Sequence, residues 1–390
     1  MFEEKRYLTE PNQPLDEVLG PYYAKYHREK CYPGLILHQG KRKMVQINVP
    51  AGDLPTLLLA KPALDNDPDS GKNRPEAPGH AEEITDYLLK RISKGKAWIL
   101  GTLTANVAPD KIEIIDLGRG ICFVVIPRSV KFDITDGQHR KFAIDKLIQS
   151  ADGELIADND FPLTLVLEAD FQQCQIDFKD MAQTKPLDKS LLSSYEFEGS
   201  SGIAKALIQQ VPIFHAKTDK VGKNPNTKKK LIYTMNYITR FVSCVFADNP
   251  NDNLEDCDVE ELAQPLVSCL NQFFSECKHT RFISETSVDD LTIDQIFEFK
   301  ENCILGRSVG LEILGRLLHC IFDPDSNEFF HQQVSQIAKI DWTRSSELWK
   351  ENVIVSNLTA KNSGKSYKIL ANAIAIKMAV NKVKEHLGWV

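Results

Sequence analysis

The fold of the first half of this chain is decided by Ile121-Cys122-Phe123-Val124-Val125-Ile126, by Val130-Lys131-Phe132-Asp133-Ile134, and by the polar segment Asp136-Gly137-Gln138-His139-Arg140 that follows them. The two apolar runs are rich in β-prone residues and predict strands, the first of them buried. Residues 141–150 carry apolar side chains at helical spacing and predict a helix. The polar segment therefore lies at a strand-to-helix junction, where backbone N–H groups and the helix dipole favour an anion.

Around this junction the first half mixes strands and helices. Apolar patterns predict strands over 43–49, 97–104, 111–117 and 162–168, and a helical period predicts a helix over 81–92. Residues 1–40 are polar and aromatic and contain the turn signal Pro33-Gly34, so we expect an irregular lead-in there.

From about residue 187 the pattern becomes helical. Helical periodicity covers 187–195, 230–246, 259–277, 293–322, 327–340 and 367–387, and only 352–355 predicts a strand. The segment Gly199-Ser200-Ser201-Gly202 marks the expected boundary. We therefore predict an α+β protein with a mixed α/β domain over 1–200 and a mostly α-helical domain over 201–390.

The composition narrows the class of protein. The 390-residue chain is 42% hydrophobic, enough for sizeable cores, and its formal net charge of −7 argues against a histone-like DNA packager but allows a local basic patch. The N-terminus has no apolar leader and no run of about 18 apolar residues occurs, so secretion and membrane spanning are not expected. Nine scattered cysteines without a C-x-x-C pair indicate a reduced, cytoplasmic protein, and no metal site is predicted.

The polar segment offers several groups that suit a phosphate. Asp136 is expected to cap the helix, and Gly137 to permit a close approach or a backbone conformation that a side chain would block. Gln138 and His139 add donors on the first turn, and the guanidinium of Arg140 is a bidentate fork. The equally good alternative is a plain capped helix whose histidine and arginine are merely solvated.

Residues 217–230 form the second candidate site. They hold six lysines against one aspartate, and their Gly, Pro and Asn residues predict an exposed loop. The lysines are Lys217, Lys220, Lys223, Lys228, Lys229 and Lys230. Such a loop can contact the DNA backbone without sequence specificity, and the alternative is a solvated surface loop.

Two further features are interpreted as structural. Asn362-Ser363-Gly364-Lys365-Ser366 contains Gly-Lys-Ser, but Thr359 stands where a P-loop requires glycine, so no P-loop is predicted. Trp342 and Trp349 are expected to pack in the core rather than to stack on bases.

The segment Asp136–Arg140 resembles the signature of the DGQHR-domain proteins, whose best-known members are the DndB proteins of DNA phosphorothioate (sulfur) modification systems. Three further stretches resemble family segments and follow in the family's order. They are Asn73-Arg74-Pro75 with His80, Pro186-Leu187-Asp188-Lys189-Ser190, and Asp341-Trp342-Thr343-Arg344 with Trp349. More distantly, the strand–turn–helix placement resembles ParB and sulfiredoxin-like domains, in which a Gly-containing motif ending in Arg binds nucleotide phosphates.

This resemblance implies a ParB/sulfiredoxin-like N-terminal domain in which Asp136, Gly137, Gln138, His139, Arg140 and Arg74 face a phosphate of a nucleotide or of DNA. It implies a DNA-binding repressor of a phosphorothioate modification operon, with double-stranded promoter DNA and other modification proteins as partners, and a homo-oligomer is a further expectation. One alternative is a nucleotide-binding enzyme that hydrolyses ATP with Mg²⁺, assisted by His139 or Asp136. The other is an adaptor for the modification enzymes.

Overall fold

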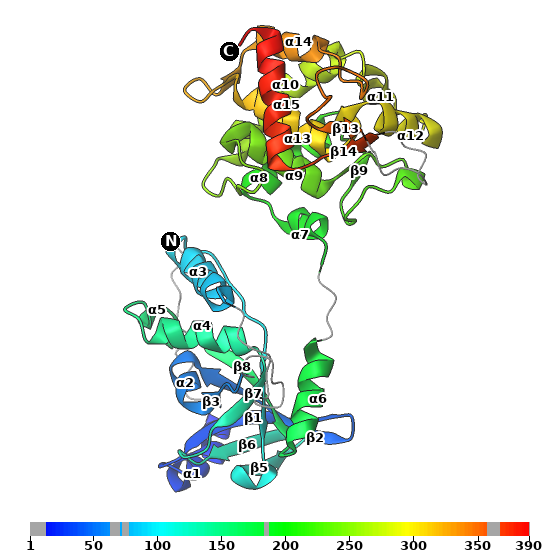
Figure 1. Ribbon diagram of the computed structural model, residues 1–390. Coiled ribbons are helices and arrows are strands. Elements are labelled where there is room, and N and C mark those ends of the chain that lie inside the picture. Colours follow the sequence, from blue (N-terminus) through cyan, green and yellow to red (C-terminus); the bar gives the residue numbers. More distant parts are fainter. Residues whose placement is uncertain (1–12, 63–70, 72–77, 183–186, 357–366, 390) are drawn as a thin grey trace. The chain divides into compact units, whose positions relative to one another are not determined.

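Two compact units make up the chain. The computed structural model describes residues 13–62, 71, 78–182, 187–356 and 367–389, and it divides the chain into 1–185 and 186–390 (Figure 1). We call these the sheet unit and the helical unit. The division falls earlier than residue 200, because Gly199-Ser200-Ser201-Gly202 is the buried first turn of helix α8 (Gly199–Gln210). The architecture is α+β, as the sequence predicts.

An eight-stranded sheet forms the centre of the sheet unit (Figure 1). Its order is β3-β7-β4-β8-β2-β1-β6-β5, with β3 and β7 parallel, β4 and β8 parallel, and the other neighbours antiparallel. The strands are β1 (Lys30–Gln39), β2 (Arg42–Pro50), β3 (Leu58–Leu59), β4 (Leu103–Val107), β5 (Glu113–Gly118), β6 (Ile121–Ile126), β7 (Phe132–Asp136) and β8 (Asp160–Leu167).

Strand β6 is buried on both faces, which explains its continuous apolar sequence. Cys122 and Val124 belong to the main core of the sheet unit, whereas Phe123 and Val125 pack with Leu19 of helix α1 in a smaller core. The helices of this unit are α1 (Gln13–Lys25), α2 (Leu54–Leu57), α3 (His80–Ser93), α4 (Gln138–Ile148), α5 (Glu154–Ala157) and α6 (Phe171–Ala182). Helix α4, which follows β7 directly, packs against α2 and α3.

Most predicted elements of the sheet unit are confirmed, but two predictions are wrong. Residues 97–102 form no strand, since β4 begins at Leu103. The expected irregular lead-in contains α1 and the ten-residue strand β1. A Cβ on Gly34 would lie 2.7 Å from the backbone oxygen of Gln46, so this glycine serves the close approach of β1 and β2 instead of a turn.

The helical unit is built around α13. Its helices are α7 (Lys189–Tyr195), α8, α9 (Met235–Ala247), α10 (Val259–Glu276), α11 (Arg281–Glu285), α12 (Ile293–Asn302), α13 (Ser308–His319), α14 (His331–Lys339) and α15 (Ala373–Leu387). The two-stranded pairs are β9 (Thr218–Asp219) with β10 (Tyr233–Thr234), β11 (Phe322–Asp323) with β12 (Glu328–Phe329), and β13 (Ile354–Ser356) with β14 (Tyr367–Ile369). The helical stretch predicted over 293–322 is thus two helices, α12 and α13, separated by a short turn.

Helix α13 packs against both α9 and α15 and buries most of its surface in the large core of this unit. At its contact with α9, a Cβ on Gly315 would lie 2.9 Å from the Cβ of Cys244 and 2.9 Å from the backbone oxygen of Phe241. The predicted core packing of Trp342 and Trp349 is confirmed: both are fully buried and their rings stack with centroids 5.3 Å apart.

We predict that Gly315→Ala destabilises the helical unit by about 1–3 kcal/mol, because the added methyl group forces α9 and α13 apart. The change is measurable as a lower midpoint of chemical unfolding of the full chain. Gly20→Ala in α1 is the control, since nothing lies within 4 Å of a Cβ there and alanine favours a helix. Equal midpoints for Gly315→Ala and the wild type would contradict this account of the contact.

Candidate functional site

Gly137 forms the junction between β7 and α4. Its φ of +94° lies in the left-handed region, and a Cβ there would meet Leu103 Cδ2 at 2.5 Å and Arg140 Nε at 3.1 Å. A residue with a side chain therefore does not fit, and the predicted need for glycine is explained by both conformation and space. The predicted cap is wrong: Gly137 is the N-cap residue, and Asp136 ends the strand without capping the helix.

The carboxylate of Asp136 instead holds Arg140. Nη2 of Arg140 donates to Asp136 Oδ2 at 2.6 Å, and Nη1 donates to the backbone oxygen of Thr102 at 3.0 Å. A Cβ on Gly101 would lie 2.6 Å from Arg140 Nη1, so a second glycine leaves space for the guanidinium. The arginine is fixed in place from two sides while its side chain stays 22% exposed.

His139 lies against a second histidine, His80, which is the first residue of α3. Their ring centroids are 4.8 Å apart and the rings meet edge to face. His139 is buried, whereas the side chain of His80 is half exposed and its Nδ1 lies 3.1 Å from Glu83 Oε2. The first turns of α3 and α4 thus bring two imidazoles together, and Arg140 is the residue that follows His139 in α4.

His80 is the residue that the site prediction missed. In the sequence it stands only within a family-like segment, and its long separation from His139 hides their contact. Two other residues were predicted for this site. Gln138 is buried, so it faces the interior of the sheet unit. Arg74 lies outside the described residues.

The charged groups of this site form two separate contacts. Asp136 pairs with the guanidinium of Arg140, and Glu83 lies beside the imidazole of His80, which carries positive charge only when protonated. Lys141, the residue after Arg140, forms a largely buried ion pair with Asp145 one turn further along α4. Within the described residues, no group of three His, Cys, Asp or Glu side chains is arranged to hold a metal ion.

The lysine segment, residues 217–230, is ordered and only partly exposed. Lys217 is buried, and its Nζ donates to the backbone oxygens of Pro212 at 3.0 Å and Ile283 at 2.8 Å. Its predicted place in an exposed loop is therefore wrong. Lys230 is half-buried and donates to the backbone oxygens of Val288 and Asp289.

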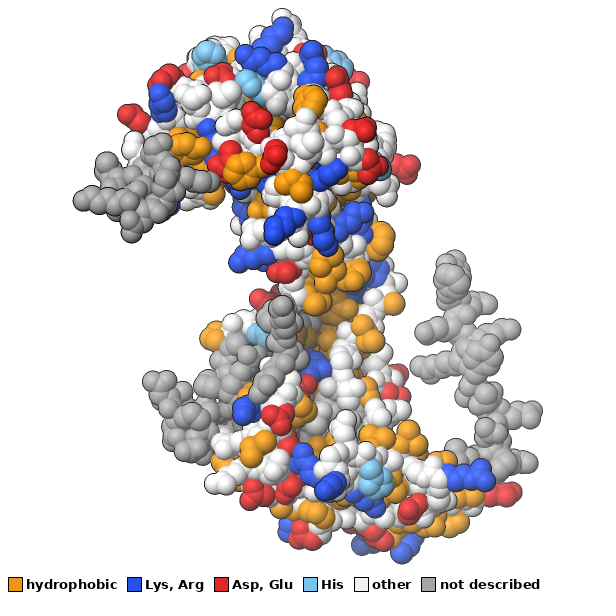
Figure 2. All heavy atoms as spheres, turned by 90° about the vertical axis from the view of Figure 1, so that its right-hand side faces the viewer, with side chains coloured by type: hydrophobic (Ala, Val, Ile, Leu, Met, Phe, Trp, Pro, Cys, Tyr) orange, Lys and Arg blue, Asp and Glu red, His pale blue; other side chains and the backbone are white. Residues whose placement is uncertain are grey.

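Four lysines of the segment remain exposed: Lys220, Lys223, Lys228 and Lys229. The backbone that carries them is held by its own side chains. Asp219 accepts from the N–H groups of Val221 and Gly222, and Asn226 accepts from that of Lys228. In Figure 2, Lys and Arg side chains are spread over the visible face of the helical unit, and several lie close together on its lower part.

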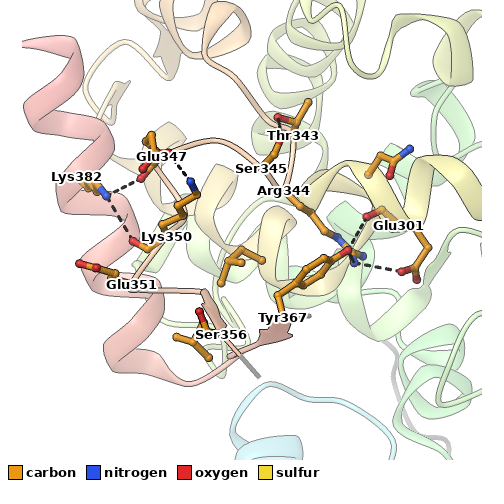
Figure 3. A pocket seen from close by; sticks show the side chains of 13 residues that line it. Glu301, Thr343, Arg344, Ser345, Glu347, Lys350, Glu351, Ser356, Tyr367 and Lys382 are labelled. Carbon is orange, nitrogen blue, oxygen red and sulfur yellow. Dashed lines mark hydrogen bonds and ion pairs between the residues drawn. The ribbon is translucent and has the colours of Figure 1, made fainter. Parts of the chain in front are cut away.

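A cavity of about 850 Å³ opens beside the segment Asp341–Arg344 (Figure 3). Arg344 is buried in its wall, where Nη1 donates to Glu301 Oε2 at 3.4 Å and to the hydroxyl of Tyr367 at 3.2 Å. Elsewhere on the wall, Lys382 donates to the backbone oxygen of Glu347 at 2.6 Å. Three acidic and three basic side chains line this cavity among the described residues, so it presents no net charge to a ligand. The rejected P-loop segment, 362–366, lies outside the described residues.

A family model described as DNA-sulfur modification-associated, DndB, matches residues 32–390. Because the match covers nearly the whole chain, the chain belongs to the DndB family and is associated with DNA sulfur modification systems. Searches of curated proteins and of solved structures return no significant match. In the described part of the chain, no helix combines the length and apolar character that crossing a bilayer requires.

The buried ammonium of Lys217 gives a pH prediction. Burial lowers its pKa from 10.5 to about 8, so between these pH values the unfolded chain holds a proton that the folded chain has released. Folding stability from this group therefore rises with pH across that window. We expect the free energy of unfolding of the wild type to increase by roughly 1–3 kcal/mol relative to that of Lys217→Met between pH 8 and 10.5.

Chemical unfolding of both proteins across this pH range measures the difference. Lys220→Met is the matched control, because the exposed ammonium of Lys220 stays in water in both states. If the difference in unfolding free energy between the wild type and Lys217→Met does not change with pH, then Lys217 is not buried.

Proposed function

We propose that this protein is a DNA-binding regulator that represses the genes of a DNA phosphorothioate modification operon. The observation that carries the proposal is the match of the DNA-sulfur modification-associated family over residues 32–390. A regulator of this kind must hold promoter DNA, and each unit of the chain offers groups suited to the phosphate backbone.

In the sheet unit, Arg140 is the proposed phosphate ligand. A guanidinium carries about five N–H donors, and among the described residues the contacts with Asp136 and Thr102 engage two of its nitrogens for one hydrogen bond each. The remaining donors are available to an incoming phosphate oxygen, and the ion pair with Asp136 holds the group in position beforehand. The backbone at Gly137 and the first turn of α4 add the positive end of the helix dipole.

In the helical unit, Lys220, Lys223, Lys228 and Lys229 are the proposed contacts with DNA. These four side chains are exposed, and their backbone is ordered by Asp219 and Asn226. Exposed ammonium groups on a fixed backbone suit the sequence-independent part of DNA binding, in which phosphate contacts release counterions. Lys217 and Lys230 are excluded from this role because backbone carbonyls already hold their ammonium groups.

The histidine pair favours a second candidate, a nucleotide-hydrolysing enzyme. His139 is buried against His80, and such a pair beside an arginine can move a proton while Arg140 holds a phosphate. An adaptor role has its own support in exposed apolar side chains of the helical unit, among them Leu187, Leu192, Tyr195 and Phe197.

We predict that Arg140→Ala weakens binding to duplex DNA from the chain's own upstream region by roughly ten-fold, the loss expected for a charge-assisted contact. Gel-shift titration at fixed salt measures the affinity. Arg128→Ala, which removes an exposed arginine of the same unit, should bind like the wild type. Arg140→Lys should restore only part of the affinity, because an ammonium lacks the bidentate fork.

Three results would redirect the proposal. Unchanged DNA affinity in Arg140→Ala would remove the motif from DNA binding. Mg²⁺-dependent release of phosphate from ATP that is lost in His139→Ala, with DNA affinity intact, would support the enzyme. Capture of modification proteins without any DNA retention would support the adaptor.

We also predict that changing Lys220, Lys223, Lys228 and Lys229 to Gln together lowers the salt dependence of DNA binding. Each phosphate contact contributes about 0.9 to the slope of log affinity against log salt, so up to about 3–4 units of slope should be lost. The matched control changes four exposed lysines on separate elements of the same unit, Lys189, Lys278, Lys339 and Lys377. Equal slopes for the two quadruple variants would mean that net charge alone matters and that the segment is not the contact.

A further inference from the structure

A smaller cavity of the helical unit, of about 520 Å³, lies where the lysine segment meets α9, α12 and α13. The lysine segment supplies Asn224 and Thr227, and the helices and the turn before α13 supply Tyr237, Lys300, Arg307 and Ser308. Among the described residues that line it, only Lys300 and Arg307 carry charge, and both are cations. The cavity of Figure 3 differs in this respect, since three acidic and three basic side chains line it.

Lys300 is a buried cation whose hydrogen-bond acceptors are neutral. It is 5% exposed, and its Nζ donates to Thr227 Oγ1 at 2.9 Å and to the backbone oxygen of Leu231 at 3.4 Å, both neutral acceptors. Within the described chain, no carboxylate forms an ion pair with it. Burial and the charge of Arg307 lower the pKa of Lys300 to about 8, although the nearby carboxylate of Glu301 acts in the opposite direction. A buried ammonium is costly unless a negative charge accompanies it, and a bound anion would supply that charge.

Arg307 places a second cation in the same wall. Its Nε donates to the backbone oxygen of Lys300 at 3.0 Å, its Nη2 contacts Glu301 Oε1 at 2.5 Å, and the side chain is 38% exposed. Arg307 is also the N-cap residue of the 12-residue helix α13, and it supplies no side-chain acceptor to the first turn. Ser308, the first residue of α13, also lines the cavity, so the positive end of the helix dipole lies beside the two cations.

We propose that this cavity binds a phosphate ester, with Lys300 and Arg307 as its cationic ligands. The donors suit a doubly charged phosphoryl group, and the cavity has room for the group that carries it. Phe297 lines the rim and is 57% exposed, so an aromatic face is available to a nucleobase. The exposed Lys228 and Lys229 follow Thr227 directly and continue the positive charge outward. This site belongs to the helical unit and is separate from the segment Asp136–Arg140.

The ligand can be a free nucleotide or the backbone of DNA, and one set of variants distinguishes them. Calorimetry at pH 7 with the full chain measures binding of inorganic phosphate and of ATP, and gel-shift titration measures binding of duplex DNA. We expect Lys300→Met and Arg307→Gln each to weaken binding of the true ligand roughly ten-fold or more. If the variants lose ATP binding and keep DNA binding, the ligand is a nucleotide. If the wild type does not bind ATP and the variants lose DNA binding, the ligand is the DNA backbone.

Lys217→Met is the control for the loss of a buried lysine, because Lys217 also donates only to neutral carbonyl groups. It should bind every probe like the wild type. Far-UV circular dichroism checks folding, and if Lys300→Met does not fold, the half-exposed Arg307→Gln decides the question. Wild-type affinity for all probes in folded Lys300→Met and Arg307→Gln would overturn the proposal, as would a folded wild type that binds none of them.

Discussion

The left-handed conformation of Gly137 is the constraint on which the candidate site depends. With φ at +94° and the side chain of Leu103 directly beside the glycine, β7 can pass into α4 without an intervening loop. That abrupt passage sets Asp136 and Arg140 four residues apart across the junction, where their side chains form an ion pair. It also turns His139 toward α3 and into contact with His80.

The elements that sequence patterns predict well are those in which local preference and burial agree. Strand β6 is continuously apolar because both faces are covered, and β2 and α4 carry the periods of a half-buried strand and a packed helix. Strand β1 escaped prediction because Pro33 and Gly34 signal a turn, whereas the glycine serves a close backbone contact with β2. The role of Asp136 was also predicted wrongly. An Asp before a helix usually caps the backbone of its first turn, but here its partner is the side chain of Arg140.

Charge in the sequence is a poor guide to charge at the surface. Lys217 and Lys220 stand in the same basic run, yet one ammonium is enclosed by carbonyl groups and the other lies in water. Lys300 lies in an ordinary helical pattern, and its burial depends on the approach of Thr227 and Leu231 from far away in sequence. Long-range contacts of this kind also bring the two histidines together, which is why the motif could be found from sequence but the pair could not.

The last residues of α12 connect the two cavities of the helical unit. Glu301 accepts from Arg307 through Oε1 and from Arg344 through Oε2, and the backbone oxygen of Lys300 accepts from both arginines. One carboxylate thus balances two guanidinium groups, each in the wall of a different cavity. If Arg307 moves away from Glu301, the carboxylate of Glu301 interacts more strongly with Arg344. The same coupling free energy applies if Arg344 moves away and Arg307 remains. Ligands of the two cavities would be coupled through this shared acid wherever either of them changes the contacts of Glu301.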